Sequence, residues 1–231
     1  MEDGGRFGGD GGRSRPVTLA VFHPRSSIIV FSRPGFTGLP ARGTLTGLMK
    51  SLQGQLLVAS PTLVDPNFFH TVVLIVQHNE EGALGLVLNR PLRTTIKEMW
   101  EQVAEEEADI EGVLYQGGPC EGPLMVIHGD DVQGEIEVTN DLYFCTSRDR
   151  VEQLMAEGGT RMKFFVGYAG WTAGQLEAEM AEPSWLTIPA TAKAVFEGDE
   201  HLWTDLVRAI SRTAVTGLVD PKRIPDDPSV N

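Results

Sequence analysis

The sequence has few cysteines, few positive charges and no long hydrophobic run. Its 2 cysteines among 231 residues cannot build a disulfide framework, which excludes the class of small secreted proteins held together by disulfides. No stretch reaches the roughly 18 uninterrupted apolar residues of a membrane-spanning helix, because the most hydrophobic early segment, residues 17–32, contains His23 and Arg25. The first residues also lack the pattern of a secretory signal peptide. We therefore expect a cytoplasmic protein that makes no membrane contact.

Positive charge is unevenly distributed. The chain has 19 Lys and Arg against 32 Asp and Glu, a net charge of −13. Residues 1–48 carry six arginines and three acids, a net +3, which leaves −16 for residues 49–231. Binding to DNA requires Lys and Arg clustered against the phosphates. The sequence therefore argues against direct, sequence-specific DNA binding by residues 49–231, although a basic arm can associate weakly with nucleic acid.

Composition changes near residue 49. Residues 1–16 contain six glycines and three arginines, and residues 17–48 show little apolar periodicity, so residues 1–48 are predicted to be a disordered extension. Two explanations stay open for it: a flexible tail, or an upstream start codon assigned in error, with Met49 as the native start. Residues 49–220 are predicted to form a single domain, since one core commonly serves roughly 200 residues. Residues 221–231 are expected to be an acidic, proline-rich tail.

Short apolar runs bounded by turn-forming residues follow from residue 54 onward. They predict nine strands, at residues 55–59, 71–77, 83–88, 113–115, 124–127, 135–138, 142–145, 163–166 and 185–188. Residues 79–82 are rich in turn formers, so residues 71–88 are predicted to form an antiparallel hairpin. Helical periodicity predicts four helices, from Thr95 onward, over 148–157, from Thr172 to before Pro183, and over 200–212. Because strands and helices do not alternate strictly, we predict an α+β domain with a mainly antiparallel sheet.

The sequence contains none of the common catalytic motifs. The nucleophile elbow, the phosphate-binding loop, the zinc-protease pattern and the dinucleotide-binding pattern are all missing. The candidate metal ligands are His70, His78, His128, His201, Cys120 and Cys145. Their spacing does not favour a shared ion, because His70 and His78 bracket one predicted strand and would lie about 26 Å apart. We therefore predict no metal, no cofactor and no recognisable catalytic residue.

Three polar or glycine-rich corners remain as candidate ligand sites. Gly117-Gly118 follows a strand and provides either a site or a turn with positive φ. Residues 167–174 (GYAGWTAG) join a strand to a helix whose free N–H groups either hold an anion or are capped by Thr172. Arg90, after Asn89, offers a bidentate phosphate or carboxylate contact, or a surface ion pair.

Several motifs together resemble the YqgE/AlgH family of bacterial proteins. They occur in the family's order, at residues 54–61 (GQLLVASP), 65–69 (DPNFF), 78–91 (HNEEGALGLVLNRP), 116–119 (QGGP), 124–128 (LMVIH), 165–171 (FVGYAGW), 174–176 (GQL) and 184–186 (SWL). The resemblance covers about residues 52–215, and the departures are the long front, Cys120 after Gly-Gly-Pro and the acidic tail. It implies a cytosolic α+β domain whose bifurcated sheet curls into a pseudo-barrel with flanking helices. It also implies a role described as transcriptional regulation, without an established activity and without catalytic residues to carry over.

These observations favour a non-enzymatic regulatory binding protein that acts through a small anionic ligand or a protein partner. We predict that eight residues, which collect at strand ends, surround one concave surface and bind the ligand: His78, Asn89, Arg90, Gly117, Gly118, Tyr168, Gly170 and Trp171. The alternative is an enzyme of unrecognised class, in which His78 or His128 acts as acid or base together with Glu81. That alternative requires the two groups to lie within hydrogen-bond reach of each other.

Deletion of residues 1–48 is expected to leave the melting temperature nearly unchanged, because their composition cannot contribute to an apolar core. Thermal unfolding of the full chain and of residues 49–231, followed by circular dichroism, measures the difference. A loss of several degrees in the shorter chain would show that the extension packs against the domain.

Overall fold

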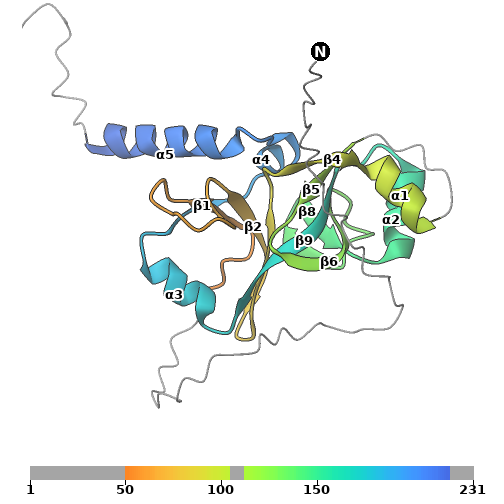
Figure 1. Cartoon of the computed structure of the whole chain (residues 1–231), viewed down its shortest axis with the longest axis horizontal. Coiled ribbons are helices and arrows are strands. Elements are labelled where there is room, and N and C mark those ends of the chain that lie inside the picture. The colour runs from red at the N-terminus through yellow and green to blue at the C-terminus, as the bar shows by residue number, and fades with distance from the viewer. Residues whose placement is uncertain (1–49, 105–111, 219–231) are drawn as a thin grey trace, which may run out of the picture.

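The computed structural model describes residues 50–104 and 112–218; the predicted extension at residues 1–48, Met49 and the predicted tail lie outside these ranges. The described residues form ten strands and five helices, in the order β1 (Gln55–Ala59), β2 (Val72–Asn79), β3 (Gly82–Val87), β4 (Pro91–Thr95), α1 (Ile96–Ala104), β5 (Val113–Gln116), β6 (Cys120–His128), β7 (Ile136–Thr139), β8 (Leu142–Cys145), α2 (Arg148–Glu157), β9 (Met162–Thr172), α3 (Gln175–Ala181), β10 (Trp185–Pro189), α4 (Ala192–Glu197) and α5 (Leu202–Leu218). All their strand pairs are antiparallel except β5 with β9. The predicted α+β class with a mainly antiparallel sheet is confirmed (Figure 1).

The sheet branches along β9. Its strands run in the order β10-β1-β2-β3-β9-β6-β8-β7, and β5 and β4 leave this path. β6 pairs with one edge of β9, whereas the other edge pairs first with β5, up to Val166, and then with β3, from Ala169 onward. Gly167, with φ +71°, lies between these two segments. The bifurcated sheet implied by the family resemblance is therefore present.

The branched sheet curls into a half-barrel. The last strand of the order, β7, returns toward β1. There the Gln53 side chain donates a hydrogen bond to the Glu137 carbonyl of β7 at 2.8 Å. Apolar side chains from the strands, together with Val195 of α4 and Leu202 of α5, fill the inside of the curl, which we call the interior core. Helix α3 covers one outer face of the sheet, and α1 and α2 cover another (Figure 1).

Local signals explain where the helices begin. Thr95 and Glu98 form the predicted capping box before α1, with N–H to side-chain distances of 2.9 and 3.1 Å. Helix α2 has the predicted bounds, and α3 starts three residues after Thr172, because Gly174 adopts a left-handed conformation with φ +74°. Among the described helices, none combines the length and the hydropathy needed to cross a membrane.

The sequence pattern misses β4 and underestimates β9. β4 begins with Pro91, which lacks an N–H group and is tolerated because this edge strand pairs only with β5. β9 continues for 11 residues, although only residues 163–166 were predicted. The reason is that Gly167 and Gly170 resemble turn residues in the sequence but lie within the strand.

Gly117 and Gly118 allow the segment after β5 to contact the backbone of β9 closely. Neither has a positive φ, so the suggestion that they supply one for a turn is wrong. A Cβ atom on Gly117 would overlap the Gly167 carbonyl oxygen, and one on Gly118 would overlap the backbone of Tyr168. The absence of side chains here lets the segment after β5 lie directly against β9.

Gly117→Ala is expected to lower the free energy of unfolding by about 3 kcal/mol, because the added methyl group would overlap backbone atoms of β9. Gly129→Ala is the matched control, since nothing lies within 4 Å of its ideal Cβ position, and its effect should stay within about 0.5 kcal/mol. Urea unfolding measures both variants. Equal stability of the two would contradict the close-contact interpretation.

Candidate functional site

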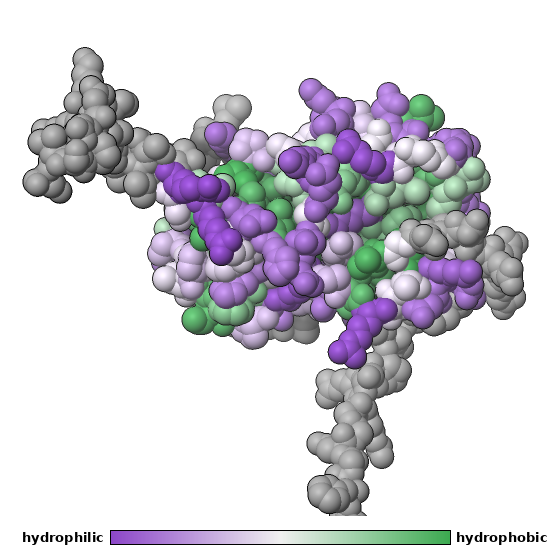
Figure 2. Space-filling model, turned by 90° about the horizontal axis from the view of Figure 1, so that it is seen from above, coloured by the Kyte–Doolittle hydropathy of each residue, from purple (hydrophilic) through white to green (hydrophobic). Residues whose placement is uncertain are grey.

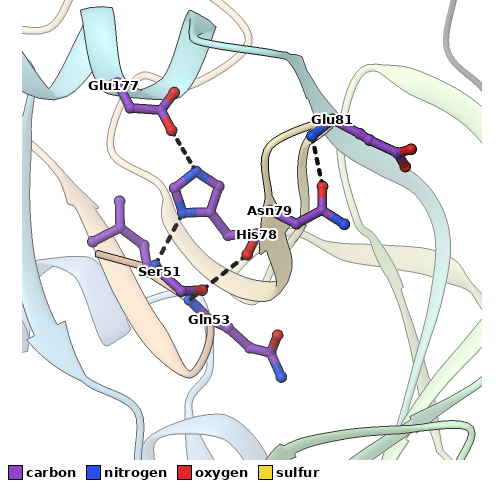
Figure 3. Close-up of polar contacts among 7 residues, drawn as sticks. Ser51, Gln53, His78, Asn79, Glu81 and Glu177 are labelled. Atoms are coloured by element: carbon purple, nitrogen blue, oxygen red, sulfur yellow. Dashed lines mark hydrogen bonds and ion pairs between the residues drawn. The ribbon is translucent and has the colours of Figure 1, made fainter. Parts of the chain in front are cut away.

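His78 lies near the end of β2, where its ring joins two other parts of the chain to the sheet (Figure 3). Nδ1 accepts a hydrogen bond from the Leu52 backbone N–H at 3.0 Å, so the ring proton sits on Nε2, which donates to Glu177 Oε1 at 2.8 Å. The Ser51 hydroxyl donates to the His78 carbonyl at 2.9 Å. His78 is 5% exposed. Both ring nitrogens thus hold the segment before β1 and helix α3 on the sheet.

Trp171 is part of the contact between α3 and the sheet. Its indole N–H donates to Glu179 Oε2 at 3.0 Å, and the indole N–H of Trp185 donates to the same oxygen at 3.2 Å. Phe68 stacks on the Trp171 ring at 5.9 Å and meets Trp185 edge-on at 5.4 Å. Trp171 is 3% exposed, so little of it is available to a ligand.

Tyr168 lies on the opposite face of β9, in the interior core. Its ring fits between two glycines, because a Cβ on Gly122 would lie 2.9 Å from one ring carbon and a Cβ on Gly170 3.1 Å from another. Burial, with a contribution from the neighbouring Cys120 thiol, raises the pKa of Tyr168 to about 12. Tyr168 and Gly170 therefore belong to the same packed strand junction as Gly117 and Gly118.

Asn89 and Arg90 hold the loop that connects β1 to β2. The Asn89 side chain accepts a hydrogen bond from the Val72 N–H and donates one to the His70 carbonyl, both at 2.9 Å. The Arg90 guanidinium donates to the Pro66 carbonyl at 3.4 Å. Burial lowers the pKa of Arg90, and the nearby Asp65 carboxylate opposes this shift.

The structure places the eight predicted site residues in three groups. Gly117, Gly118, Tyr168 and Gly170 meet at the strand junction, His78 and Trp171 lie under α3, and Asn89 and Arg90 lie at the start of β2. Val72 and His78 are six residues apart on one strand, which corresponds to about 20 Å. Ligand binding by any of these residues stays a prediction.

Comparison with known proteins identifies the family. The model of the AlgH-like family matches residues 56–214. The chain belongs to the AlgH-like family. It is 39% identical over 163 residues to a UPF0301 protein of Chlorobaculum tepidum, which covers 68% of this chain and 85% of the relative, and 42% identical over 152 residues to one of Xanthomonas axonopodis, which covers 63% and 81%. The solution structure of AlgH from Pseudomonas aeruginosa, 33% identical, matches with a TM-score of 0.59 over 74% of this chain and 93% of that one. The predicted family is confirmed.

The alternative acid and base residues of this AlgH-like protein lie apart. His128 is fully buried; its Nδ1 accepts a hydrogen bond from the Asp130 N–H at 3.3 Å, and its Nε2 has no hydrogen-bond partner among the described residues. Burial lowers the pKa of His128, while Asp130 opposes the shift. Glu81 is exposed in the β2–β3 turn and bonds to neither histidine. The pairing that acid–base catalysis would need is not formed.

Three aromatic rings that the sequence pattern did not predict to meet are stacked at the surface. The His70 ring lies 3.6 Å from the Phe69 ring and 3.7 Å from the Trp203 ring of α5. His70, with φ 53°, is the one residue other than glycine with a positive φ in the described part of the chain. The sequence marked His70 as a candidate metal ligand, but no three His, Cys, Asp or Glu side chains converge on a metal site within residues 50–104 and 112–218.

Acidification is expected to destabilise the AlgH-like protein through His128. Because burial lowers the pKa of this ring in the folded state, the unfolded chain binds a proton near pH 6.5 that the folded chain does not. The free energy of unfolding therefore falls as the pH drops below about 6.5. His128→Met removes this titration, so its stability should fall less between about pH 7 and pH 5 in urea unfolding.

The matched control is His201→Gln, since the His201 side chain is 71% exposed. In this variant the free energy of unfolding should fall with pH as steeply as in the wild type. A slope that is the same in His128→Met and in the wild type would contradict the role of burial at His128.

Proposed function

We propose that this AlgH-like protein is a non-enzymatic regulatory binding protein of the bacterial cytoplasm. It affects transcription indirectly, through a small anionic ligand or a protein partner. The resemblance to the YqgE/AlgH family implies a regulatory role, and the chemistry of the described residues favours binding over catalysis.

The observation that carries this proposal is that His78 uses both ring nitrogens for hydrogen bonds within the fold. Its two ring nitrogens are engaged by Leu52 and Glu177, so the ring has no free nitrogen for a substrate. His128 is fully buried, and burial raises the pKa of Cys145 to about 12, which keeps this thiol in its unreactive protonated form. Side chains that would serve an enzyme are thus used to hold or fill the scaffold.

Charge supports an indirect effect on transcription. Residues 49–231 contain 13 basic residues against 29 acidic ones. The neighbouring helices α4 and α5 do not resemble a DNA-reading pair, because α4 has six residues and a single basic side chain, Lys193. Hydrophilic residues cover most of the face seen in Figure 2, and apolar ones form separate patches. Such a surface favours a compact ligand or a locally docked partner over an extensive apolar interface.

The proposal predicts that the full chain binds no promoter duplex with sequence selectivity at physiological salt. The probes are the promoters whose transcripts change most when the gene is deleted, each compared with a scrambled duplex by fluorescence anisotropy. Weak, non-selective binding that disappears at higher salt is expected from the arginines of residues 1–48. The chain of residues 49–231 is the control that lacks them.

Two outcomes would contradict the proposal. One is sub-micromolar, sequence-selective binding by residues 49–231, because it would make the acidic domain a direct DNA reader. The other is a deletion strain with no change in any transcript, because no regulatory effect would then remain to be explained.

A further inference from the structure

Lys163 is a buried cation that forms no ion pair among the described residues. The residue is 4% exposed, and its Nζ forms no ion pair within 4.0 Å in the described part of the chain. Nζ donates one hydrogen bond, to the Gly198 carbonyl at 2.6 Å, and lies 4.0 Å from the centroid of the Tyr115 ring. An ammonium group has three N–H donors, so its capacity exceeds these contacts. Buried charges are normally paired, which makes Lys163 an exception that calls for a partner.

Lys163 lies beneath the segment that joins α4 to α5, because its Nζ bonds to the Gly198 carbonyl. Gly198 lies between α4 and α5, and these helices with residues 198–201 form what we call the helical cover of the half-barrel (Figure 1). Val195 and Leu202 of the cover are buried in the interior core, whereas Asp199, Glu200 and His201 between them are exposed. The short segment of residues 198–201 therefore lies between Lys163 and the outside of the cover.

A second cation, Arg161, directly precedes β9, the strand that contains Lys163, and also contacts the cover. The Arg161 guanidinium lies 5.0 Å from the centroid of the Phe196 ring of α4, and Arg161 is exposed. It forms no ion pair within the described residues. Two cations two residues apart thus contact the same end of α4, and neither forms an ion pair within 4.0 Å in residues 50–104 and 112–218.

We propose that the helical cover opens onto a binding site for an amphipathic carboxylate of the fatty-acid type. The carboxylate pairs with Lys163 and Arg161, and the alkyl chain occupies the part of the interior core that Val195 and Leu202 fill in the closed state. This inference rests on the proposed function, because it names the chemical class of the small anionic ligand.

Electrostatics favour the replacement of the cover by a ligand carboxylate at Lys163. Burial lowers the pKa of Lys163 to about 8, and Asp199 is the one carboxylate that opposes this shift. At neutral pH the amine is still mainly charged. Asp199 belongs to the cover and leaves with it, so an incoming carboxylate replaces both a distant acid and a neutral carbonyl with a direct charge pair.

Few polar contacts oppose opening. The cover is held by the Lys163 hydrogen bond, by the Trp203 indole N–H, which donates to the Ala59 carbonyl at 2.8 Å, and by the stacking of Trp203 on His70. Arg161 adds its contact with the Phe196 ring. The remaining attraction comes from apolar side chains of α4 and α5 that pack on the interior core, with Val195 and Leu202 among the buried ones, and an alkyl chain replaces part of these contacts. Trp203 therefore reports whether the cover is closed.

The test measures decanoate binding to the full chain by isothermal titration calorimetry, below the concentration at which decanoate forms micelles. The expected result is saturable binding that Lys163→Met weakens by at least about tenfold. Lys193→Met is the matched control, because Lys193 is an exposed lysine of α4 and should leave the affinity unchanged. Arg161→Gln, at an exposed position that does not threaten folding, should also weaken binding.

Two further probes separate the head group from the chain. Decanol, which has the chain without the charge, and acetate, which has the charge without the chain, should each bind at least about tenfold more weakly than decanoate. In protein labelled with 5-fluorotryptophan, decanoate should shift the fluorine resonance of Trp203, assigned with Trp203→Phe.

Absence of decanoate binding would overturn the inference, as would equal affinity in the wild type, Lys163→Met and Arg161→Gln. Decanol binding as tightly as decanoate, or a Trp203 resonance unmoved by bound decanoate, would also overturn it. None of these results touches the promoter-duplex and deletion experiments. Failure of the ligand class is therefore distinguishable from failure of the regulatory function.

Discussion

The contact between Gly117 and β9 is the constraint on which the rest of the structure depends. The Gly117 N–H donates to the Val166 carbonyl at 2.9 Å, and the Gly117 carbonyl accepts from the Val87 N–H at 2.8 Å. A single residue without a side chain thus joins β9 and β3 at the end of β5. Because β5 and β3 leave the same edge of β9 from this point, the sheet can split and curl around one interior core while keeping two further clusters on its outer faces.

Side chains that look chemically active serve the same architecture. Glu179 fixes two indoles, and His78 and Glu177 tie α3 to the chain before β1. Glu179 resists displacement, because removing it would leave the N–H groups of two buried indoles, Trp171 and Trp185, without a partner. These polar contacts tie α3 to the sheet, whereas α4 and α5 are attached mainly by apolar side chains that pack on the interior core and by few polar contacts.

The sequence predicts much of the fold wherever neighbouring residues alone determine a helix or a strand. Helix α2 has the predicted bounds because its apolar spacing ends at two glycines, and β1 and β8 are short apolar runs between turn residues. β4 and the second half of β9 are missed because Pro91 and Gly167 normally interrupt strands, and only pairing with distant segments makes them acceptable. The candidate site could not be assembled from sequence for a related reason. Polar residues at strand ends do not reveal which end of the sheet they share, and Asn89 and His78 lie at opposite ends of β2. Lys163 resembles any lysine in a strand, since its burial depends on Gly198, 35 residues later.

The pairing of β1 with β10 bears on how this chain is made by the ribosome. Gln55 pairs with Pro189, so this edge of β1 has no partner strand until more than 130 further residues have been synthesised. At translation rates of about 5–20 residues per second, that edge of β1 stays unpaired for about 7 to 27 seconds. Residues 56–59 are completely buried in the finished domain and are exposed along this edge until β10 emerges. A chain that stalls after β9 presents an apolar strand with free backbone groups, which is the kind of surface that other nascent chains and chaperones bind.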